Sequence, residues 1–269
     1  MFSLFLLHCS NIFRKFAKSD KLRTRYSQLG SFIERLPEVF EQEGNVVFRG
    51  RNVIKSFLVP TSEGDMTVVV KRYKRPNIFQ KIGYSFFRST KACRAYENAL
   101  ELQRRGFATP EPYGYIELRE KGLIDYCYFI SAVDDSHPIS EQLNDIEEFN
   151  HALAADYARF VAQLHQQGII DIDLNSGNVL YQLQADGSYT FSLIDINRMD
   201  FYTGYPPLAE CMENLTRFTG RMDVFEYVAR EYVKARGMGE DMVQRFVDAK
   251  IVHDRNWKRR KAITHPFKR

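Results

Sequence analysis

The first part of the chain carries the hydrophobic pattern of β-strands. Residues 45–59 and 66–73 are rich in β-branched and aromatic side chains, and a polar cluster at 62–65 separates them. Two such runs joined by a short turn predict an antiparallel hairpin. Two more strand-like runs, 113–118 and 124–133, continue the same pattern toward the middle of the chain.

Residues 91–105, between these strands, follow a helical pattern instead. Apolar or small side chains recur there at three- and four-residue intervals, and Gly106 follows the run. This spacing gathers the apolar side chains on one face and predicts an amphipathic helix with a glycine stop. The loop around Asp134–Pro138 follows the last strand-like run and is the expected boundary between two lobes.

The second part of the chain is mainly helical. Residues 148–167 place apolar side chains at three- and four-residue intervals, and a second clear helical run covers 222–236. Between them, Val179–Leu183 and Tyr189–Ile194 predict a short hairpin. A β-rich first part with one helix, joined to a mainly helical second part, predicts a two-lobed α+β fold.

Composition and charge refine this picture. The 269 residues, of which 44% are hydrophobic and 27% charged, are enough for two lobes with separate cores. The formal net charge of +4 is unevenly placed, with six Lys/Arg against one Asp from Arg14 to Arg25, and seven Lys/Arg with no acid from Arg255 onward. Two interpretations stay open: solvated termini, or contact with anionic phosphates of a membrane or a phosphorylated glycolipid.

The first seven residues are apolar and precede the first basic run. They are too few to span a bilayer and lack a small-residue cleavage site, so neither a transmembrane helix nor a secretory signal is predicted. Residues 1–30 form a basic N-terminal segment. This segment is either an interfacial membrane contact, with Phe2, Leu6, Phe13 and Phe16 on one helix face, or a misassigned start of the chain.

The most informative residues are an Asp and an Asn five positions apart, followed by another Asp after an apolar strand. Residues 171–178 read Asp-Ile-Asp-Leu-Asn-Ser-Gly-Asn, and Asp195 follows the run at 189–194. Phosphoryl transfer needs an oriented hydroxyl and metal ions that neutralise phosphate charge. We therefore expect Asp173 to orient the acceptor hydroxyl, and Asn178 and Asp195 to bind the Mg²⁺ that carries ATP. The alternative is an acidic surface loop with asparagines in turn positions.

Four further residues complete the expected nucleotide site. Lys71 ends an apolar strand, where a kinase places the lysine that pairs with the α- and β-phosphates. Glu97, with Glu101 as the rival position, lies on the helix at 91–105 and is its expected partner. Gly44 and Gly50 flank the start of the first hairpin, and glycines there allow backbone amides to approach a phosphate. The alternatives are a surface lysine, a solvated glutamate and a β-bulge.

The order of these elements resembles the protein-kinase-like superfamily and, more narrowly, the lipopolysaccharide core kinases (Kdo/heptose kinases) of Gram-negative bacteria. The resemblance covers roughly residues 31–220. It rests on five short motifs, which are Val68-Val69-Val70-Lys71, Thr109-Pro110-Glu111-Pro112, Leu164-His165-Gln166-Gln167-Gly168, Asp173-Leu174-Asn175-Ser176-Gly177-Asn178 and Leu193-Ile194-Asp195-Ile196-Asn197-Arg198-Met199.

This resemblance implies a bilobal protein-kinase-like fold. It implies an N-lobe at 31–134 and a C-lobe with a basic tail at 135–269. The implied reaction is ATP- and Mg²⁺-dependent phosphorylation of a sugar hydroxyl, on Kdo or heptose attached to lipid A, at the cytoplasmic face of the inner membrane. The implied partner is therefore a lipid-linked sugar of the Kdo-lipid A type, reached by peripheral membrane contact.

The loop departs from the protein-kinase pattern at several positions. Ile172 replaces the arginine that grips a phosphorylated activation loop, so such regulation has no electrostatic basis here. Asn175 replaces the lysine that contacts the γ-phosphate in Ser/Thr kinases, as happens in sugar and antibiotic kinases. Asp171 stands at the usual histidine position, where a carboxylate near Asp173 would raise a pKa or add a metal ligand. His165 is expected to be a packing histidine at a helix end.

Two alternatives to a lipopolysaccharide sugar kinase stay open. One is a protein or small-molecule kinase of the same fold, and the other is a catalytically silent pseudokinase that acts as a binding module. Retention of Lys71, Asp173, Asn178 and Asp195 together favours an active enzyme. Nucleic-acid binding is not expected, because the basic residues lack interleaved recognition signatures. The pattern predicts neither the accepted sugar nor the oligomeric state.

Overall fold

The computed structural model describes residues 21–24 and 26–264, which group into two compact units. Unit 1 contains the described residues up to Glu101 together with Pro110–Asp134, and unit 2 contains Leu102–Thr109 and the described residues from Asp135 onward. The chain thus divides after Asp134, inside the boundary loop. Leu102–Thr109, expected in the first lobe, groups with unit 2, where Leu193 N donates to Ala108 O at 3.1 Å.

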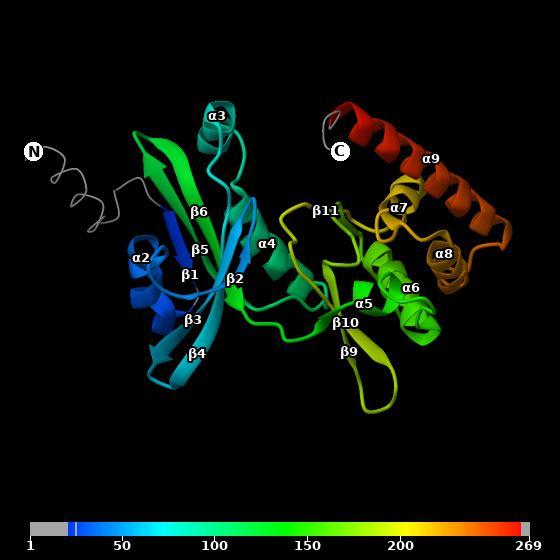
Figure 1. Cartoon of the computed structure of the whole chain (residues 1–269), viewed down its shortest axis with the longest axis horizontal. Helices are drawn as coiled ribbons and strands as arrows, with labels where there is room; N and C mark the ends of the chain where they lie inside the picture. The colour runs from blue at the N-terminus through cyan, green and yellow to red at the C-terminus, as the bar shows by residue number, and fades with distance from the viewer. Residues whose placement is uncertain (1–20, 25, 265–269) are drawn as a thin grey trace, which may run out of the picture. The chain divides into compact units, whose positions relative to one another are not determined.

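Unit 1 is built on a six-stranded antiparallel sheet with the strand order β1-β5-β6-β4-β3-β2 (Figure 1). Its strands are β1 (Lys21–Thr24), β2 (Asn45–Arg49), β3 (Val53–Thr61), β4 (Gly64–Arg72), β5 (Pro112–Glu120) and β6 (Leu123–Ala132). The hairpin of β3 and β4 and the two following strands are confirmed. The single strand predicted for 45–59 is wrong, because a turn in which Gly50 N donates to Asn52 O divides it in two.

Helices lie on both faces of this sheet. The helical elements of unit 1 are η1 (Ser27–Leu29), α2 (Gly30–Val39), α3 (Ile78–Phe86) and α4 (Lys91–Arg104). Phe32, Leu36 and neighbouring residues of α2 pack on one face of the sheet, against side chains such as Ile116. Tyr96 of α4 packs with Tyr115. Because neighbouring residues of a strand point to opposite faces, α2 and α4 cover opposite sides of the sheet.

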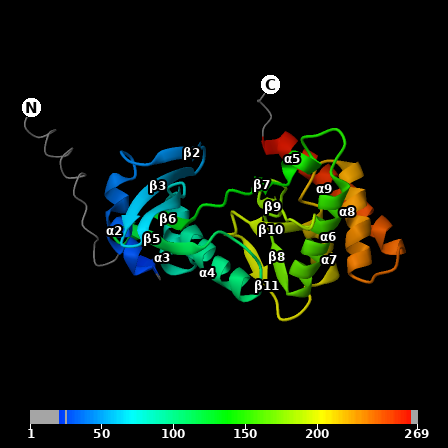
Figure 2. The same ribbon diagram turned by 90° about the horizontal axis from the view of Figure 1, so that it is seen from below.

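Unit 2 combines buried helices with two small sheets. Its elements are β7 (His137–Pro138), α5 (Ser140–Leu143), α6 (His151–Gln166), β8 (Ile169–Asp171), β9 (Val179–Leu183), β10 (Tyr189–Leu193), β11 (Met199–Phe201), α7 (Leu208–Leu215), α8 (Met222–Ala235) and α9 (Asp241–Thr264). The sheets have the orders β10-β9-β7 and β11-β8. Helix α6 lies beside α8, and α9 lies against α7 and α8 (Figure 2). The predicted helices at 148–167 and 222–236 and the predicted hairpin are confirmed.

The two charged ends of the chain differ in what the structure describes. The interfacial contact predicted for the start of the chain falls on residues 1–20, which lie outside the described residues. Lys21–Thr24, counted with that segment in the sequence, instead form β1 and pair with β5. Arg255 and the basic residues up to Lys261 lie in α9. No helix within 21–24 and 26–264 combines the length and apolar character needed to cross a bilayer.

Candidate active site

Two antiparallel strand pairings in unit 2 bring the predicted loop and Asp195 together. Strand β9 begins directly after Asn178 and pairs with β10, and Ile194 N donates to Asn178 O at 2.9 Å. Strand β8 ends at Asp171, which pairs with Met199 of β11. The segment after β8 and the segment after β10 are therefore held side by side, as the spacing of Asp173, Asn178 and Asp195 predicts.

Asn178 is oriented by the backbone of the loop itself. Its Nδ2 donates to Asp173 O at 3.0 Å. Since this bond uses the amide nitrogen, the Oδ1 atom is the end of the side chain that is available to a cation. A neutral amide oxygen is a suitable ligand for Mg²⁺.

Asp195 has a backbone conformation that residues other than glycine rarely adopt. Its φ is +56°, in the left-handed region. Asn197 holds it there: Nδ2 of this buried side chain donates to Asp195 Oδ1 at 2.8 Å and to Asp195 O at 3.3 Å. An aspartate in the left-handed backbone conformation costs free energy on the order of 1 kcal/mol. This conformation persists where surrounding contacts enforce it, which is common at functional sites. The sequence interpretation missed the role of Asn197.

Asp173 forms an ion pair within the same set of loops. Arg198 Nη1 donates to Asp173 Oδ1 at 2.8 Å, and Arg198 lies three residues after Asp195. The side chain of Asp173 is about one-third exposed, so it remains accessible from solvent. The contact of Arg198 with Asp173 was not predicted from the sequence, although Arg198 lies in the motif Leu193–Met199.

Asp171, which the sequence leaves unassigned, is almost completely buried. Its Oδ1 accepts a hydrogen bond from Asp173 N at 2.9 Å, whereas its Oδ2 has no partner among the described residues. The pKa of Asp171 is raised to about 7, mainly by burial; the carboxylates of Asp173 and Asp195 contribute to the rise, while the Asp173 backbone bond and Arg198 oppose it. Asp171 therefore holds the backbone of Asp173 and binds a proton far more tightly than a solvated carboxyl.

A chain of buried hydrogen bonds connects this loop to the helical core. Asn214, at the end of α7, donates from Nδ2 to Asp171 O at 2.5 Å and faces His165 Nε2 through Oδ1 at 3.0 Å. His165 Nδ1 lies 2.7 Å from the hydroxyl of Tyr232, which accepts from Arg236. Because Asn214 Oδ1 is an acceptor, Nε2 of His165 carries the ring proton and Nδ1 accepts from Tyr232.

The protonation state of His165 fits this chain. Burial lowers the pKa of His165 to about 4, against a smaller opposing effect of the Asn214 hydrogen bond. The ring is therefore neutral near pH 7, as one donor and one acceptor nitrogen require. His165 is buried, as expected for a packing histidine, and it also fixes the position of the loop through Asn214.

The predicted nucleotide residues of unit 1 lie on its sheet and on α4. Lys71 is in β4, and its Nζ lies 5.3 Å from the centre of the Tyr73 ring. Glu97 is half exposed on α4, and its carboxylate pairs with Arg23 of β1. Glu97 therefore already has one cationic partner, and the pairing of Lys71 with Glu97 or Glu101 stays a prediction.

The two predicted glycines have local structural roles. Gly44 has a φ of +80°, and a Cβ there would lie 2.7 Å from the Phe57 ring. A Cβ at Gly50 would lie 2.8 Å from the Phe48 ring, and Gly50 N already donates to Asn52 O. The left-handed backbone and the buried Phe57 ring therefore require glycine at position 44, whereas the exposed Phe48 ring can move away from a side chain at position 50. Phosphate binding by this hairpin stays a prediction.

Comparison with known proteins adds an independent observation. The sequence model of the lipopolysaccharide kinase (Kdo/WaaP) family matches residues 50–220, more than half of the chain. The chain belongs to this family. The match includes Lys71, Asp173, Asn178 and Asp195, and it confirms the family resemblance. No curated protein matches the chain.

A solved structure of this family shows the same fold. The chain is similar to WaaP in complex with acyl carrier protein, with a TM-score of 0.57 and 16% sequence identity over 91% of this chain and 98% of that one. The likeness confirms a kinase-like α+β fold with a β-rich first part and a helical second part. Its family makes this lipopolysaccharide kinase a transferase that acts on the lipopolysaccharide core, and the family implies the use of ATP.

The site of this lipopolysaccharide kinase fits a metal held jointly with phosphates. Among the described residues, no three His, Cys, Asp or Glu side chains form a metal-binding group. The candidate ligands are instead one amide oxygen, from Asn178, and one carboxylate, from Asp195. Mg²⁺ is usually held by one or two protein ligands, with phosphate oxygens and water completing its shell. The donor set therefore suits Mg²⁺ that arrives with ATP.

Asn175, which replaces the γ-phosphate lysine of Ser/Thr kinases, serves the loop structure. Its Nδ2 donates to Asp173 O at 2.9 Å, and its Oδ1 accepts from Gly177 N at 3.0 Å. Asn175 and Asn178 thus both donate to the carbonyl of Asp173. The two amides fix the loop backbone directly before Leu174, which is fully buried.

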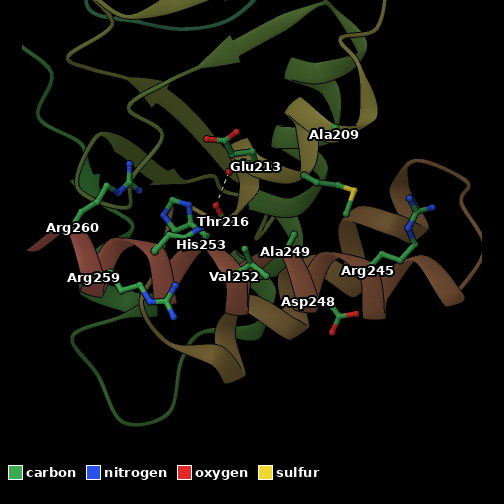
Figure 3. Close-up of a pocket in the computed structure, with 12 residues that line it drawn as sticks. Ala209, Glu213, Thr216, Arg245, Asp248, Ala249, Val252, His253, Arg259 and Arg260 are labelled. Carbon is green, nitrogen blue, oxygen red and sulfur yellow. Dashed lines mark hydrogen bonds between the residues drawn. The ribbon is translucent and has the colours of Figure 1, made fainter.

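Unit 2 also contains a cavity of about 890 Å³ that lies apart from these residues, between α7 and α9 (Figure 3). It is lined by Ala209, Met212, Glu213, Thr216, Arg245, Asp248, Ala249, Val252, His253, Asn256, Arg259 and Arg260. Glu213 is paired with Arg217 at 2.6 Å. None of the residues predicted to bind ATP or to act on the acceptor lines this cavity.

Proposed function

We propose that this lipopolysaccharide kinase transfers the γ-phosphate of ATP to a sugar hydroxyl of the inner core, on Kdo or heptose attached to lipid A. The observation that carries the proposal is the bond from Asn178 Nδ2 to Asp173 O. It joins the side chain of a candidate metal ligand to the backbone of the candidate catalytic residue, while the bond from Ile194 N to Asn178 O holds the residue before Asp195 beside them. A carboxylate and two oxygen ligands are thereby held in one rigid set of loops.

Asp173 is the catalytic residue in this proposal. It accepts a hydrogen bond from the acceptor hydroxyl and takes its proton as the hydroxyl oxygen bonds to the γ-phosphorus and the bond to ADP breaks. Arg198 holds the carboxylate through Oδ1. That contact positions Asp173 and leaves Oδ2 for the hydroxyl.

The proposed cofactors are ATP and Mg²⁺. Asn178 Oδ1 and the carboxylate of Asp195 hold the metal, which neutralises the charge of the transferred phosphate when bound. Asn197 fixes the Asp195 carboxylate before the nucleotide arrives. Lys71 contacts the α- and β-phosphates, with Glu97 or Glu101 as its partner. The β2–β3 hairpin, with Gly44 and Gly50, covers the phosphates.

A lipid-linked sugar is the proposed acceptor because the loop lacks the arginine with which regulated protein kinases bind a phosphorylated activation loop. Ile172 stands at the arginine position, and its carbonyl accepts from Arg217 Nη1 at 3.0 Å. We therefore propose that 31–134 and 135–269 act as kinase lobes and that the enzyme works as a peripheral protein at the cytoplasmic face of the inner membrane. Acyl carrier protein, bound in the similar WaaP structure, is a candidate protein partner to be tested by co-purification.

The test is transfer of labelled phosphate from ATP to Kdo-lipid A in the presence of Mg²⁺, with a heptose-bearing acceptor in parallel. Asp173→Asn is expected to reduce the rate by a factor of about 10²–10⁴, because it removes the proton acceptor. The control is Asp145→Ala, which replaces an exposed aspartate of the same unit and is expected to retain full activity. Transfer to a protein with none to either glycolipid would overturn the proposal.

A further inference from the structure

Helix α3 presents its apolar face to solvent. Ile78, Phe79, Ile82 and Phe86 are 56%, 83%, 42% and 69% exposed, and Phe87, directly after the helix, is 83% exposed. At about 100° per residue, the four helical side chains fall within one stripe of the surface. No residue of α3 is buried. An exposed patch of this kind marks an interaction site.

The polar face of α3 is the face that contacts the protein. Ser85 Oγ accepts from Ile124 N at 2.9 Å, at the start of β6. Lys81 Nζ forms an ion pair with the buried carboxylate of Asp125 at 3.0 Å. Figure 1 shows α3 next to the sheet of unit 1, joined to β4 and α4 by its flanking segments. This orientation is the reverse of an ordinary amphipathic helix, which turns its apolar stripe toward the core.

The helix also forms without a fully buried apolar side chain. Asn77 and Gln80 make a capping box, in which Gln80 N donates to Asn77 Oδ1 at 2.9 Å and Asn77 N donates to Gln80 Oε1 at 3.3 Å. Nine residues alone would be marginal as a helix in water. The cap and the contacts with β6 therefore hold the apolar stripe ready for a partner.

The charge around this stripe identifies the partner. From Met66 to Tyr96 the chain has eight Lys/Arg and no Asp or Glu. Some of these cations pair with acids of other segments, but Lys74, four residues before α3, and Arg88, two residues after it, are exposed and have no ion-pair partner among the described residues. The Arg88 guanidinium lies 5.7 Å from the centre of the Tyr84 ring. An apolar stripe on a helix that is flanked in sequence by exposed cations complements an anionic lipid surface, in which phosphates lie just outside the acyl chains.

We infer that α3 and Phe87 form a membrane-docking element, which inserts its apolar stripe into the interface of an anionic leaflet while Lys74 and Arg88 contact lipid phosphates. The inference rests on the proposed function in so far as a lipid-linked acceptor requires the enzyme at a membrane. It adds that unit 1 carries the contact, independently of the chain ends.

A tryptophan placed in the stripe tests the insertion directly. The chain has one tryptophan, the half-exposed Trp257 of α9. The full chain with Trp257→Phe and Phe79→Trp therefore has one reporter, in α3. On addition of vesicles containing phosphatidylglycerol, its emission is expected to shift to shorter wavelength and to be quenched by brominated acyl chains. Vesicles of phosphatidylcholine alone are expected to give a much smaller shift.

A loss-of-binding series provides the second measurement. Phe79→Ser with Phe86→Ser is expected to weaken sedimentation with anionic vesicles at least tenfold. The matched control, Leu58→Ser with Leu183→Ser, removes two exposed apolar side chains from strands β3 and β9 and is expected to bind as the unchanged protein does. Circular dichroism checks that both variants remain folded.

Three outcomes would overturn the inference. Sedimentation with vesicles but no emission shift at position 79 would place the contact elsewhere, and no sedimentation would exclude a membrane contact. If the emission shifts with rising protein concentration in the absence of lipid, the stripe contacts a second copy of the chain instead. Phosphate transfer to a delipidated acceptor separates the two proposals, because the α3 variant is expected to retain it, whereas Asp173→Asn loses it.

Discussion

Arg198 donates from Nη1 to Oδ1 of Asp173 at 2.8 Å, so the candidate catalytic carboxylate is held by a cation only three residues beyond Asp195. The same short segment therefore supplies a candidate metal ligand and the group that orients the candidate base. This arrangement couples the position of Asp173 to the conformation around Asp195.

Removing this cation tests whether it positions Asp173. Arg198→Ala is expected to lower kcat by roughly 10–100-fold with little change in the KM for ATP, because a misplaced catalytic group loses reactivity more than binding. Arg198→Lys is expected to recover part of the rate. The control is Arg159→Ala, which removes an exposed arginine paired with Asp156 on α6. Unchanged or faster turnover in Arg198→Ala would show that the ion pair shields Asp173 instead.

Asn178 is the residue whose replacement should change the metal requirement. Asn178→Ala removes the candidate Oδ1 ligand together with the bond to Asp173 O. We expect the Mg²⁺ concentration for half-maximal activity to rise by about tenfold or more, with kcat also reduced. Asn175→Ala, which removes the other amide donor to Asp173 O, is the matched variant. An equal metal requirement in both variants would count against Asn178 as a ligand.

Asp171 predicts a specific pH dependence of stability. Its pKa is about 7 in the folded protein, against about 4 in the unfolded chain, so the folded state holds the proton more tightly. The unfolding free energy it contributes is full below about pH 4 and is lost as the pH rises to about 7.

The matching variant is Asp171→Asn, which keeps an acceptor for Asp173 N but cannot ionise. Relative to the unchanged protein, this variant is expected to gain roughly 2–4 kcal/mol between pH 4 and pH 8, in urea unfolding monitored by circular dichroism. Asp65→Asn replaces an exposed carboxyl and should show no such gain. A pH-independent difference between the variant and the unchanged protein would show that Asp171 is ionised when folded.

The buried hydrogen-bond chain gives a prediction of opposite sign. His165, with a pKa of about 4 in the folded protein, is neutral there, whereas the unfolded chain binds a proton below about pH 6.5. Its contribution to stability is therefore full above pH 6.5 and is lost as the pH falls toward 4.

Breaking the chain at Asn214 tests its structural role. Asn214→Ala removes the acceptor of His165 Nε2 and one of two donors to Asp171 O, which also accepts from Leu174 N at 3.1 Å. The unfolding free energy is therefore expected to fall by about 1–3 kcal/mol. Turnover is expected to fall as well, because the loop before Asp173 loses its link to α7. Asn214→Asp keeps an acceptor for His165 but not the donor to Asp171 O. If Asn214→Ala is unfolded, Asn214→Asp provides the comparison, and full turnover in it would contradict the link.

Sequence patterns predicted the candidate catalytic loop because its residues are close in the sequence and follow a fixed spacing. Asn178 lies five residues after Asp173, and a hairpin of ordinary length returns the chain to Asp195. Asn214 could not be predicted in this way, because its contact with Asp171 spans 43 positions and depends on helix packing. The turn at Gly50 was missed because β-branched residues continue on both sides of it.

Helix α3 was missed for a different reason. A pattern of apolar positions is normally interpreted as a helix face turned toward the core. Nothing in the sequence from Ile78 to Phe87 indicates that this face is turned toward solvent instead. Only the bonds of Lys81 and Ser85 to the start of β6 show which face contacts the sheet. Hydrophobic periodicity indicates that a face exists, but not what covers it.

The position of the single tryptophan decides what an optical unfolding experiment on the unmodified protein measures. Trp257, with Lys261 Nζ 4.7 Å from its ring centre, lies on α9 in unit 2. Its emission therefore follows the melting of unit 2 alone, whereas calorimetry registers heat absorbed by both units. A difference between the two midpoints would show that the β-rich unit and the helical unit unfold as separate cooperative bodies.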